Sequence, residues 1–278
     1  MRFVVAGLLV GLLLSAARPL AGQDLPAPLA DKFSSGVAAL KAGALDDAEA
    51  AFREVLHSGG DRSFVHYNLG IVLQTRGRHE EAVTEFRTAL RLDPSFALAH
   101  LLAGSSLLAL NRISDATTEL RLAAKAMPNE RAVHLSLADA YERAHNYGAL
   151  VNEFRRLQAL EPGNPDYSYR LGKAYLKLAQ WSFERIRSID PDAARLQQAL
   201  GLQYLDQNRP DFARNALERA ATRDPTLDEV HLALARLHLE QGDLEQARVE
   251  VERELAIAPS SAAALALKAE IETSATHH

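Results

Sequence analysis

Residues 63–94, SFVHYNLGIVLQTRGRHEEAVTEFRTALRLDP, decide the fold because they contain two helical patterns with a break between them. Apolar residues recur at helical spacings over residues 65–73, and again over residues 82–90. Gly77 closes the first pattern and Asp93-Pro94 ends the second, as expected of residues that stop a helix. The stretch therefore predicts a hairpin of two short helices.

The same arrangement recurs along most of the chain at a step of 34 residues. Six prolines mark the ends of successive units and lie 34, 34, 29, 34 and 34 positions apart: Pro94, Pro128, Pro162, Pro191, Pro225 and Pro259. Small residues keep the same step at Gly36, Gly70, Gly104, Ala138, Gly172, Gly201 and Ala235. A small residue where two helices cross leaves room for larger neighbours, so these positions predict closely packed helix pairs.

The positions of the small and large residues resemble the tetratricopeptide repeat. In residues 63–94 they are Leu69-Gly70, Ala82, Phe86, Ala89 and Pro94, at positions 7, 8, 20, 24, 27 and 32 of the unit. The resemblance covers residues 29 to 273 and implies an all-α, right-handed α-solenoid of helix-turn-helix repeats with a C-terminal capping helix. The fourth unit departs from the pattern at Ala138 and Leu150, and the large aromatic residue usual at position 4 is absent.

The repeats also predict the organisation of the chain. Seven units are expected, and they begin near Leu29, Ser63, Ala97, Arg131, Pro165, Ala194 and Asp228. We expect a linker at residues 23–28, four repeats at 29–164, a shortened repeat at 165–193, two repeats at 194–259, and a capping helix and tail at 260–278.

The fifth unit is five residues short and holds YLKLAQWSFERIRSIDP (175–191), with the only tryptophan of the chain. Counting from both sides places the missing residues in the turn between its two helices. Apolar or small residues continue at helical spacings from Leu171 to Ile189, which favours one long helix from about Tyr167 to Ser188. The alternative is a tight turn at LAQWS with Trp181 packed into it. A long helix would either shape a groove between the blocks or record a tolerated deletion.

The N-terminus, MRFVVAGLLVGLLLSAARPLAGQ, is typical of a secretory signal peptide at residues 1–22. Arg2 supplies the positive start, Phe3 to Leu14 the apolar stretch, and small residues up to Gly22 the cleavage region. As a helix the apolar stretch spans about 18 Å, less than the roughly 30 Å of a bilayer core. We therefore expect cleavage, no stable transmembrane span afterwards, and a periplasmic or extracellular location. An uncleaved signal anchor is the alternative.

Composition excludes several classes of function. The chain has no cysteine, which rules out disulfides and thiolate sites, and its net charge is −5 with basic residues spread along it, so no nucleic-acid surface is expected. Nucleotide-binding, hydrolase and zinc-protease motifs are absent, so we expect no enzyme activity and no cofactor. Histidines recur at position 4, where neighbouring units are about 10 Å apart, too far for a shared metal. They are His66, His100, His134 and His231.

Binding is the remaining role, because solenoids bind on their concave surface. The resemblance implies that the first helix of each unit lines this surface, chiefly at positions 2, 5, 9, 12 and 13. The candidate residues are mainly apolar in the first three units and mainly charged afterwards: Phe33, Val37, Phe64, Tyr67, Asn68, Ile71, Leu98, Leu101 and Leu108, then Asp139, Arg143, Tyr169, Lys173 and Lys177. A ligand with an apolar and a polar segment is expected, such as an extended peptide or an amphipathic helix. The alternative is that some of the apolar residues are core shared by neighbouring helices.

The sequence therefore predicts an exported scaffold or assembly factor that binds a protein or peptide. The carboxylate clamp of chaperone-binding relatives is absent, and so is an asparagine ladder at position 6. A second hypothesis is a regulatory or carrier subunit that contacts envelope polysaccharide or a membrane-associated enzyme. Its sugar-binding version would need an aromatic-rich groove, whereas aromatic residues make up 6% of the chain. The partner and the oligomeric state are left open.

Overall fold

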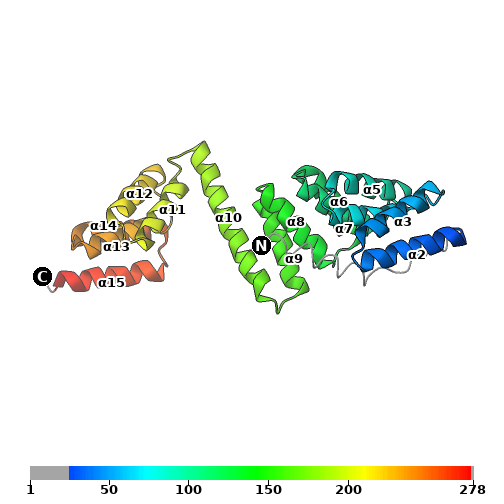
Figure 1. Ribbon diagram of the computed structural model, residues 1–278. Helices are drawn as coiled ribbons and strands as arrows, with labels where there is room; N and C mark the ends of the chain where they lie inside the picture. Colours follow the sequence, from blue (N-terminus) through cyan, green and yellow to red (C-terminus); the bar gives the residue numbers. More distant parts are fainter. Residues whose placement is uncertain (1–24, 277–278) are drawn as a thin grey trace. The chain divides into compact units, whose positions relative to one another are not determined.

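The computed structural model describes residues 25–276, and these residues form helices joined by short turns (Figure 1). The all-α repeat fold expected from the sequence is confirmed. The chain divides after Leu178 into two compact units, which are described separately. The predicted signal peptide at residues 1–22 lies outside the described residues. Within them, no helix is both long and apolar enough to cross a membrane.

The first compact unit contains four helix pairs, which correspond to four repeats, followed by the start of a long helix. The pairs are α2 (Ala27–Lys41) with α3 (Leu45–His57), α4 (Ser63–Thr75) with α5 (His79–Leu92), α6 (Ala97–Ala109) with α7 (Ile113–Ala126), and α8 (Arg131–Arg143) with α9 (Tyr147–Leu160). The long helix is α10 (Pro165–Ile189), and the boundary between the units falls within it. The second unit holds α11 (Ala194–Asp206), α12 (Pro210–Arg223), α13 (Val230–Glu240), α14 (Leu244–Ile257) and α15 (Ala262–Thr276).

Each helix pair turns at a residue with a left-handed backbone conformation. In every pair this residue stands at position 15 of its repeat. The six residues have φ between 54° and 78° and are Gly43, Gly77, Asn111, His145, Asn208 and Gly242. Glycine adopts this conformation without a steric penalty, and asparagine tolerates it better than most residues. The turn therefore depends on one position that the sequence pattern identifies.

Position 15 of the fifth unit is Ala179, and here the chain does not turn. The helix α10 runs continuously from Pro165 to Ile189 (Figure 1), which is the single long helix that the sequence favoured over a tight turn. Left-handed backbone costs alanine about 1 to 2 kcal/mol, and the five missing residues leave too little chain for a loop. Continuing the helix is therefore the less costly conformation.

Glycines at position 8 allow the two helices of a pair to approach closely. A Cβ added to Gly70 would lie 2.6 Å from the ring of Phe86, and one added to Gly104 would lie 2.6 Å from Cγ of Leu120. Gly36 and Gly201 have the same relation to Phe52 and Leu217. The space that these glycines leave is thus filled by a large side chain of the second helix, as the repeat pattern predicts.

Gly172, at the same position of α10, is the exception. A Cβ added there would meet no atom within 4 Å, because no second helix of its own unit packs on it. The helix instead packs through Tyr167, Leu171, Ala174 and Leu178 against α8 and α9. Its other sides expose large hydrophobic residues: six of the twelve such side chains in the described residues belong to α10.

Candidate functional site

The structure places four of the predicted apolar binding residues in the core. Phe33 and Tyr67 are 8% exposed, Leu108 is 6% exposed and Leu101 is 1% exposed. The ring of Phe33 lies 5.0 Å from that of Phe64 on the next first helix, so the two helices share these side chains. The expectation that these four residues face a ligand is wrong, since neighbouring helices already cover them.

The other predicted apolar residues are partly accessible. Val37 on α2, Phe64 and Ile71 on α4, and Leu98 on α6 are half-buried and pack against one common core cluster. Asn68 is also half-buried, and its side-chain Nδ2 donates to the carbonyl oxygen of Phe64 at 2.7 Å. We call these five residues, together with the charged set on α8 and α10 described next, the first-helix face.

The charged part of the first-helix face consists of residues that bind one another. Arg143 forms an ion pair with Asp139 at 2.7 Å and donates through Nη1 to the carbonyl oxygen of Leu108 at 2.8 Å. Lys177 of α10 pairs with Glu142 of α8, which the structure brings together across 35 residues. Lys173 lies 5.5 Å from the centre of the Tyr169 ring. Exposed pairs of this kind are worth about 0 to 1 kcal/mol, so a ligand can replace them.

Histidines at position 4 form a recurrent contact that sequence reasoning missed. Each ring Nδ1 lies against a glutamate 19 residues later, on the second helix of the same unit. The distances are 2.6 Å for His66 and Glu85, 2.7 Å for His100 and Glu119, 2.7 Å for His134 and Glu153, and 2.6 Å for His231 and Glu250. The sequence held a signal for this, because a glutamate stands at position 23 in each unit that has the histidine. We call these pairs the His–Glu clips.

The surroundings of His134 favour the charged form of its ring. Its Nε2 lies 2.8 Å from the carbonyl oxygen of Pro128, which can only accept a hydrogen bond, while Nδ1 faces the carboxylate of Glu153. In the charged ring both nitrogens donate. The bond to Glu153 raises the pKa of His134 although burial opposes the charge. At His66 burial also opposes the charge, but Glu85 and Asp61 outweigh it and raise the pKa. The clips thus stabilise the helix pairs.

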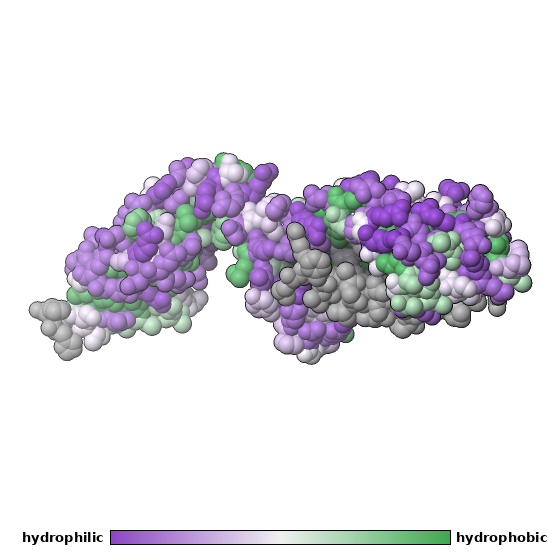
Figure 2. Space-filling view, viewed as in Figure 1, coloured by the Kyte–Doolittle hydropathy of each residue, from purple (hydrophilic) through white to green (hydrophobic). Residues whose placement is uncertain are grey.

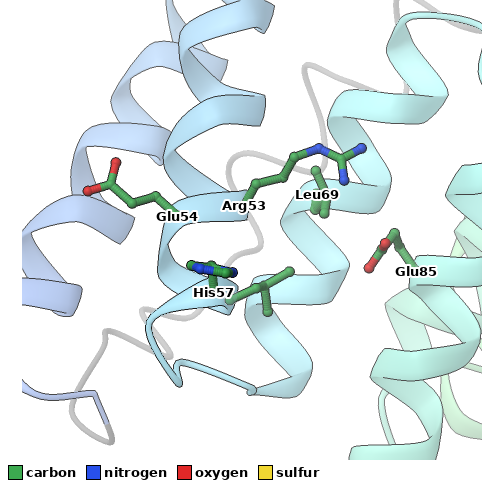
Figure 3. A pocket seen from close by; sticks show the side chains of 6 residues that line it. Arg53, Glu54, His57, Leu69 and Glu85 are labelled. Carbon is green, nitrogen blue, oxygen red and sulfur yellow. The ribbon is translucent and has the colours of Figure 1, made fainter.

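A shallow hollow of about 640 Å³ lies between α3, α4 and α5 (Figure 3). Figure 3 shows Arg53 extending from α3 toward Leu69, with Glu85 on the opposite wall. Arg53 is already paired with Glu49 at 2.9 Å, and Glu85 holds His66. Arg53 and Glu85 of this hollow are therefore already engaged by neighbouring side chains.

On the face that Figure 2 shows, the described part of the surface is mainly hydrophilic. Figure 2 shows hydrophilic residues over most of the described part of the visible face, with hydrophobic residues gathered in smaller patches. Two leucines on the second helices of repeats in the first compact unit are exposed: Leu92 of α5 by 38% and Leu122 of α7 by 45%. Isolated residues of this kind are normal on a protein surface.

Comparison with known proteins agrees with the repeat geometry. Two family models described as tetratricopeptide repeat match the chain, one at residues 67–131 and the other at residues 204–271. These two stretches are therefore similar to the tetratricopeptide repeat. One match lies in each of the two units. A search of curated proteins finds no match.

Solved structures of tetratricopeptide repeat proteins are similar in fold. A tetratricopeptide repeat protein from Parabacteroides merdae has a TM-score of 0.52 and 13% identity, over 89% of this chain and 100% of that one. PilF of Pseudomonas aeruginosa has a TM-score of 0.46 and 18% identity, over 87% and 97%. YrrB, described as having an unusual peptide-binding site, has a TM-score of 0.41 and 15% identity, over 78% and 97%. At these identities the likeness concerns the fold alone.

Proposed function

We propose that the chain is a non-enzymatic scaffold that binds a segment of another protein on the first-helix face. The observation that carries this proposal is the series of half-buried apolar side chains on three successive first helices. Val37 on α2, Phe64 and Ile71 on α4, and Leu98 on α6 belong to one core cluster and are still partly open to solvent. Tetratricopeptide repeats supply such a surface without a preformed pocket.

The series favours an extended or helical segment over a small molecule. Fully burying a large apolar side chain contributes about 1.5 to 3 kcal/mol, so covering the smaller, still exposed part of each of the four contributes at most about 1 kcal/mol. The contributions are spread over three helices, which suits a long ligand with apolar residues at regular intervals. On α8 and α10 the ligand would exchange its own charges with the pairs that Arg143 and Lys177 form.

Export belongs to the same proposal. It rests on the apolar stretch from Phe3 to Leu14, which lies outside the described residues. A partner in the cell envelope or outside the cell is therefore proposed. Mass spectrometry of the purified product, after expression of the full sequence, would give the N-terminus, and we expect it near Gln23.

The test compares two pairs of substitutions in the purified product. Ile71→Glu with Leu98→Glu places two charges on the first-helix face. The matched control, Leu92→Glu with Leu122→Glu, makes the same chemical change on exposed leucines of α5 and α7. Partners are captured from an envelope extract, one is isolated, and its Kd for each variant is measured by calorimetry, with circular dichroism to confirm equal helix content.

We expect the first variant to weaken binding by at least about 30-fold, the effect of losing roughly 2 kcal/mol at a central contact. The control should bind as the unmodified chain does. Equal weakening by both variants, or equal binding by both with the helix content intact, would place the binding surface elsewhere.

A further inference from the structure

The turn between the first and second repeats differs in sequence from the turns that follow the later repeats. Each of the second to seventh units ends in proline, but the first has Gly60 at the corresponding position. Proline fixes one backbone angle of a turn, whereas glycine leaves the backbone more freedom than any other residue. Gly59 beside it has φ of 89°, a conformation that favours glycine. Residues 58–62, which we call the glycine turn, therefore depend on other contacts to stay ordered.

His66 of α4 makes such a contact with the glycine turn. Its Nε2 lies 2.8 Å from Oδ1 of Asp61 in the turn, and its Nδ1 lies 2.6 Å from Oε2 of Glu85 on α5. In the other three His–Glu clips, Nε2 instead faces the carbonyl oxygen of the preceding proline, at 3.4 Å, 2.8 Å and 3.2 Å. Of the four histidine rings, that of His66 alone thus lies between two carboxylates.

The charge of the His66 ring decides whether both contacts hold. A carboxylate only accepts hydrogen bonds and a neutral imidazole has one N–H, so a neutral ring leaves one nitrogen lone pair against a carboxylate oxygen. The charged ring donates to both. Burial disfavours this charge, but Glu85 and Asp61 outweigh it and raise the pKa of His66. Both contacts are therefore complete below the ordinary histidine pKa, and one is lost as the pH rises through the raised value.

Asp61 is the partner that separates when the ring loses its proton. Its side chain is 58% exposed, whereas that of Glu85 is 20% exposed. Water can take the place of His66 at an exposed carboxylate at little cost, so the neutral ring keeps its N–H on Glu85. The release concerns the glycine turn alone, because Val55 and Val65 belong to an apolar core cluster that still holds α3 on α4.

The other charged groups around the ring have partners of their own. Three of them, all on α3, line the hollow beside Glu85: Arg53, Glu54 and His57. Arg53 is paired with Glu49, and Glu54 is paired with Lys32. In the glycine turn, Arg62 donates through Nη1 to the backbone carbonyl oxygen of Asp61 at 3.0 Å. The ionisation of His66 is therefore governed by burial and by its two carboxylate partners.

We propose that His66 is a proton-dependent latch on the glycine turn, closed while its ring is charged and open once the ring is neutral. The latch does not depend on the binding proposed for the first-helix face. The sixth unit has a similar contact that cannot switch, since Gln197 at position 4 donates through Nε2 to the carbonyl oxygen of Pro191 at 2.8 Å. An amide side chain does not titrate, so the turn before α11 is held equally at each pH.

Hydrogen exchange of the backbone amides, followed by NMR on the product purified after expression of the full sequence, tests the proposal. Exchange is expressed as protection factors, which remove the intrinsic pH dependence of the reaction. Two amides report on the glycine turn: that of Gly60 donates to the carbonyl oxygen of Val55 at 2.9 Å, and that of Val65 to Arg62 at 3.0 Å. The amide of Ala193, in the turn before α11, is the internal control.

Three variants separate the latch from a general effect of pH. His66→Gln copies the sixth unit and removes the titrating group. Asp61→Asn keeps the shape of the side chain in the glycine turn but removes its charge. Asp31→Asn is the matched control, because it makes the same chemical change at an exposed position of α2 in the same repeat.

We expect the protection factors of Gly60 and Val65 to fall at least about fivefold between pH 6 and pH 8.5, while that of Ala193 stays constant. The fall should vanish in His66→Gln. In Asp61→Asn it should shrink and its midpoint should move to lower pH, whereas Asp31→Asn should leave the midpoint in place. Equal protection of the glycine turn at both pH values in the unmodified chain would overturn the proposal. So would a fall that persists in His66→Gln, or the same midpoint in Asp61→Asn as in Asp31→Asn.

Discussion

Two single substitutions of glycine by alanine should change the free energy of unfolding in opposite directions, although both glycines stand at position 8 of their repeats. The first is Gly104 on α6, and the second is Gly172 on α10. Both lie in the first compact unit, so the same unfolding transition reports on each. The difference between them follows from the missing second helix of the fifth unit.

The magnitudes follow from the space around each glycine. A Cβ at Gly104 would lie 2.6 Å from Cγ and 2.8 Å from Cδ2 of Leu120, which is closer than such atoms approach. Overpacking of this kind costs about 1 to 3 kcal/mol, and the higher helix propensity of alanine returns about 0.8 to 1 kcal/mol. The expected net loss is about 1 kcal/mol, within a range of about 0 to 2 kcal/mol. At Gly172 no overpacking cost arises, and only the higher helix propensity of alanine applies. Gly172→Ala should therefore be more stable than the unmodified chain by about 0.5 to 1 kcal/mol.

The assay is urea unfolding followed by circular dichroism, with the protein at about 1 µM. Gly104→Ala should lower the urea midpoint and Gly172→Ala should raise it, with similar slopes. A loss of stability in Gly172→Ala as large as that in Gly104→Ala would refute the reasoning, because it would mean that a helix covers Gly172.

Two further predictions concern pH. The pKa of His134 is raised by its bond to Glu153, so the clip contributes fully below the ordinary histidine pKa and is lost as the pH rises through the raised value. Glu153→Gln should therefore cost about 1 to 2 kcal/mol in urea unfolding at pH 6 and less at pH 9, and an equal cost at both would contradict this. Burial opposes the charge of Glu49, but hydrogen bonds from three arginines lower its pKa to about 2. Its contribution is present above the ordinary glutamate pKa and lost as the pH falls toward 2, so Glu49→Gln should cost about 1 to 2 kcal/mol at pH 7 and little near pH 2, whereas exposed Glu54→Gln should cost little at either.

The sequence predicted the helix pairs because their determinants are local and recur. Glycine at position 8 and a large residue at position 24 meet within one unit, so their spacing alone implies the contact between Gly70 and Phe86. The turn at position 15 is equally local, and Ala179 marks the unit in which no turn forms. The length of α10 could therefore be predicted from one residue type and five missing residues.

The surface proposed for binding was harder to predict because exposure depends on neighbouring repeat units. Phe33, Tyr67 and Tyr169 all occupy position 5 of their repeat units. The first two are nevertheless 8% exposed, whereas Tyr169 is 65% exposed. Phe33 contacts Phe64 of the adjacent unit, and Tyr67 contacts Phe96, the residue before α6, whereas Tyr169 is contacted by Lys173 of its own helix. Position along one helix does not reveal this, since the covering side chains come from elsewhere in the chain.

Hydrogen exchange of the backbone amides, with and without an isolated partner, tests the central claim most directly. Binding on the first-helix face should slow exchange in α2, α4 and α6 and change it least in the second helices α3, α5 and α7. Slower exchange confined to those second helices, or to α11–α15, would contradict the account.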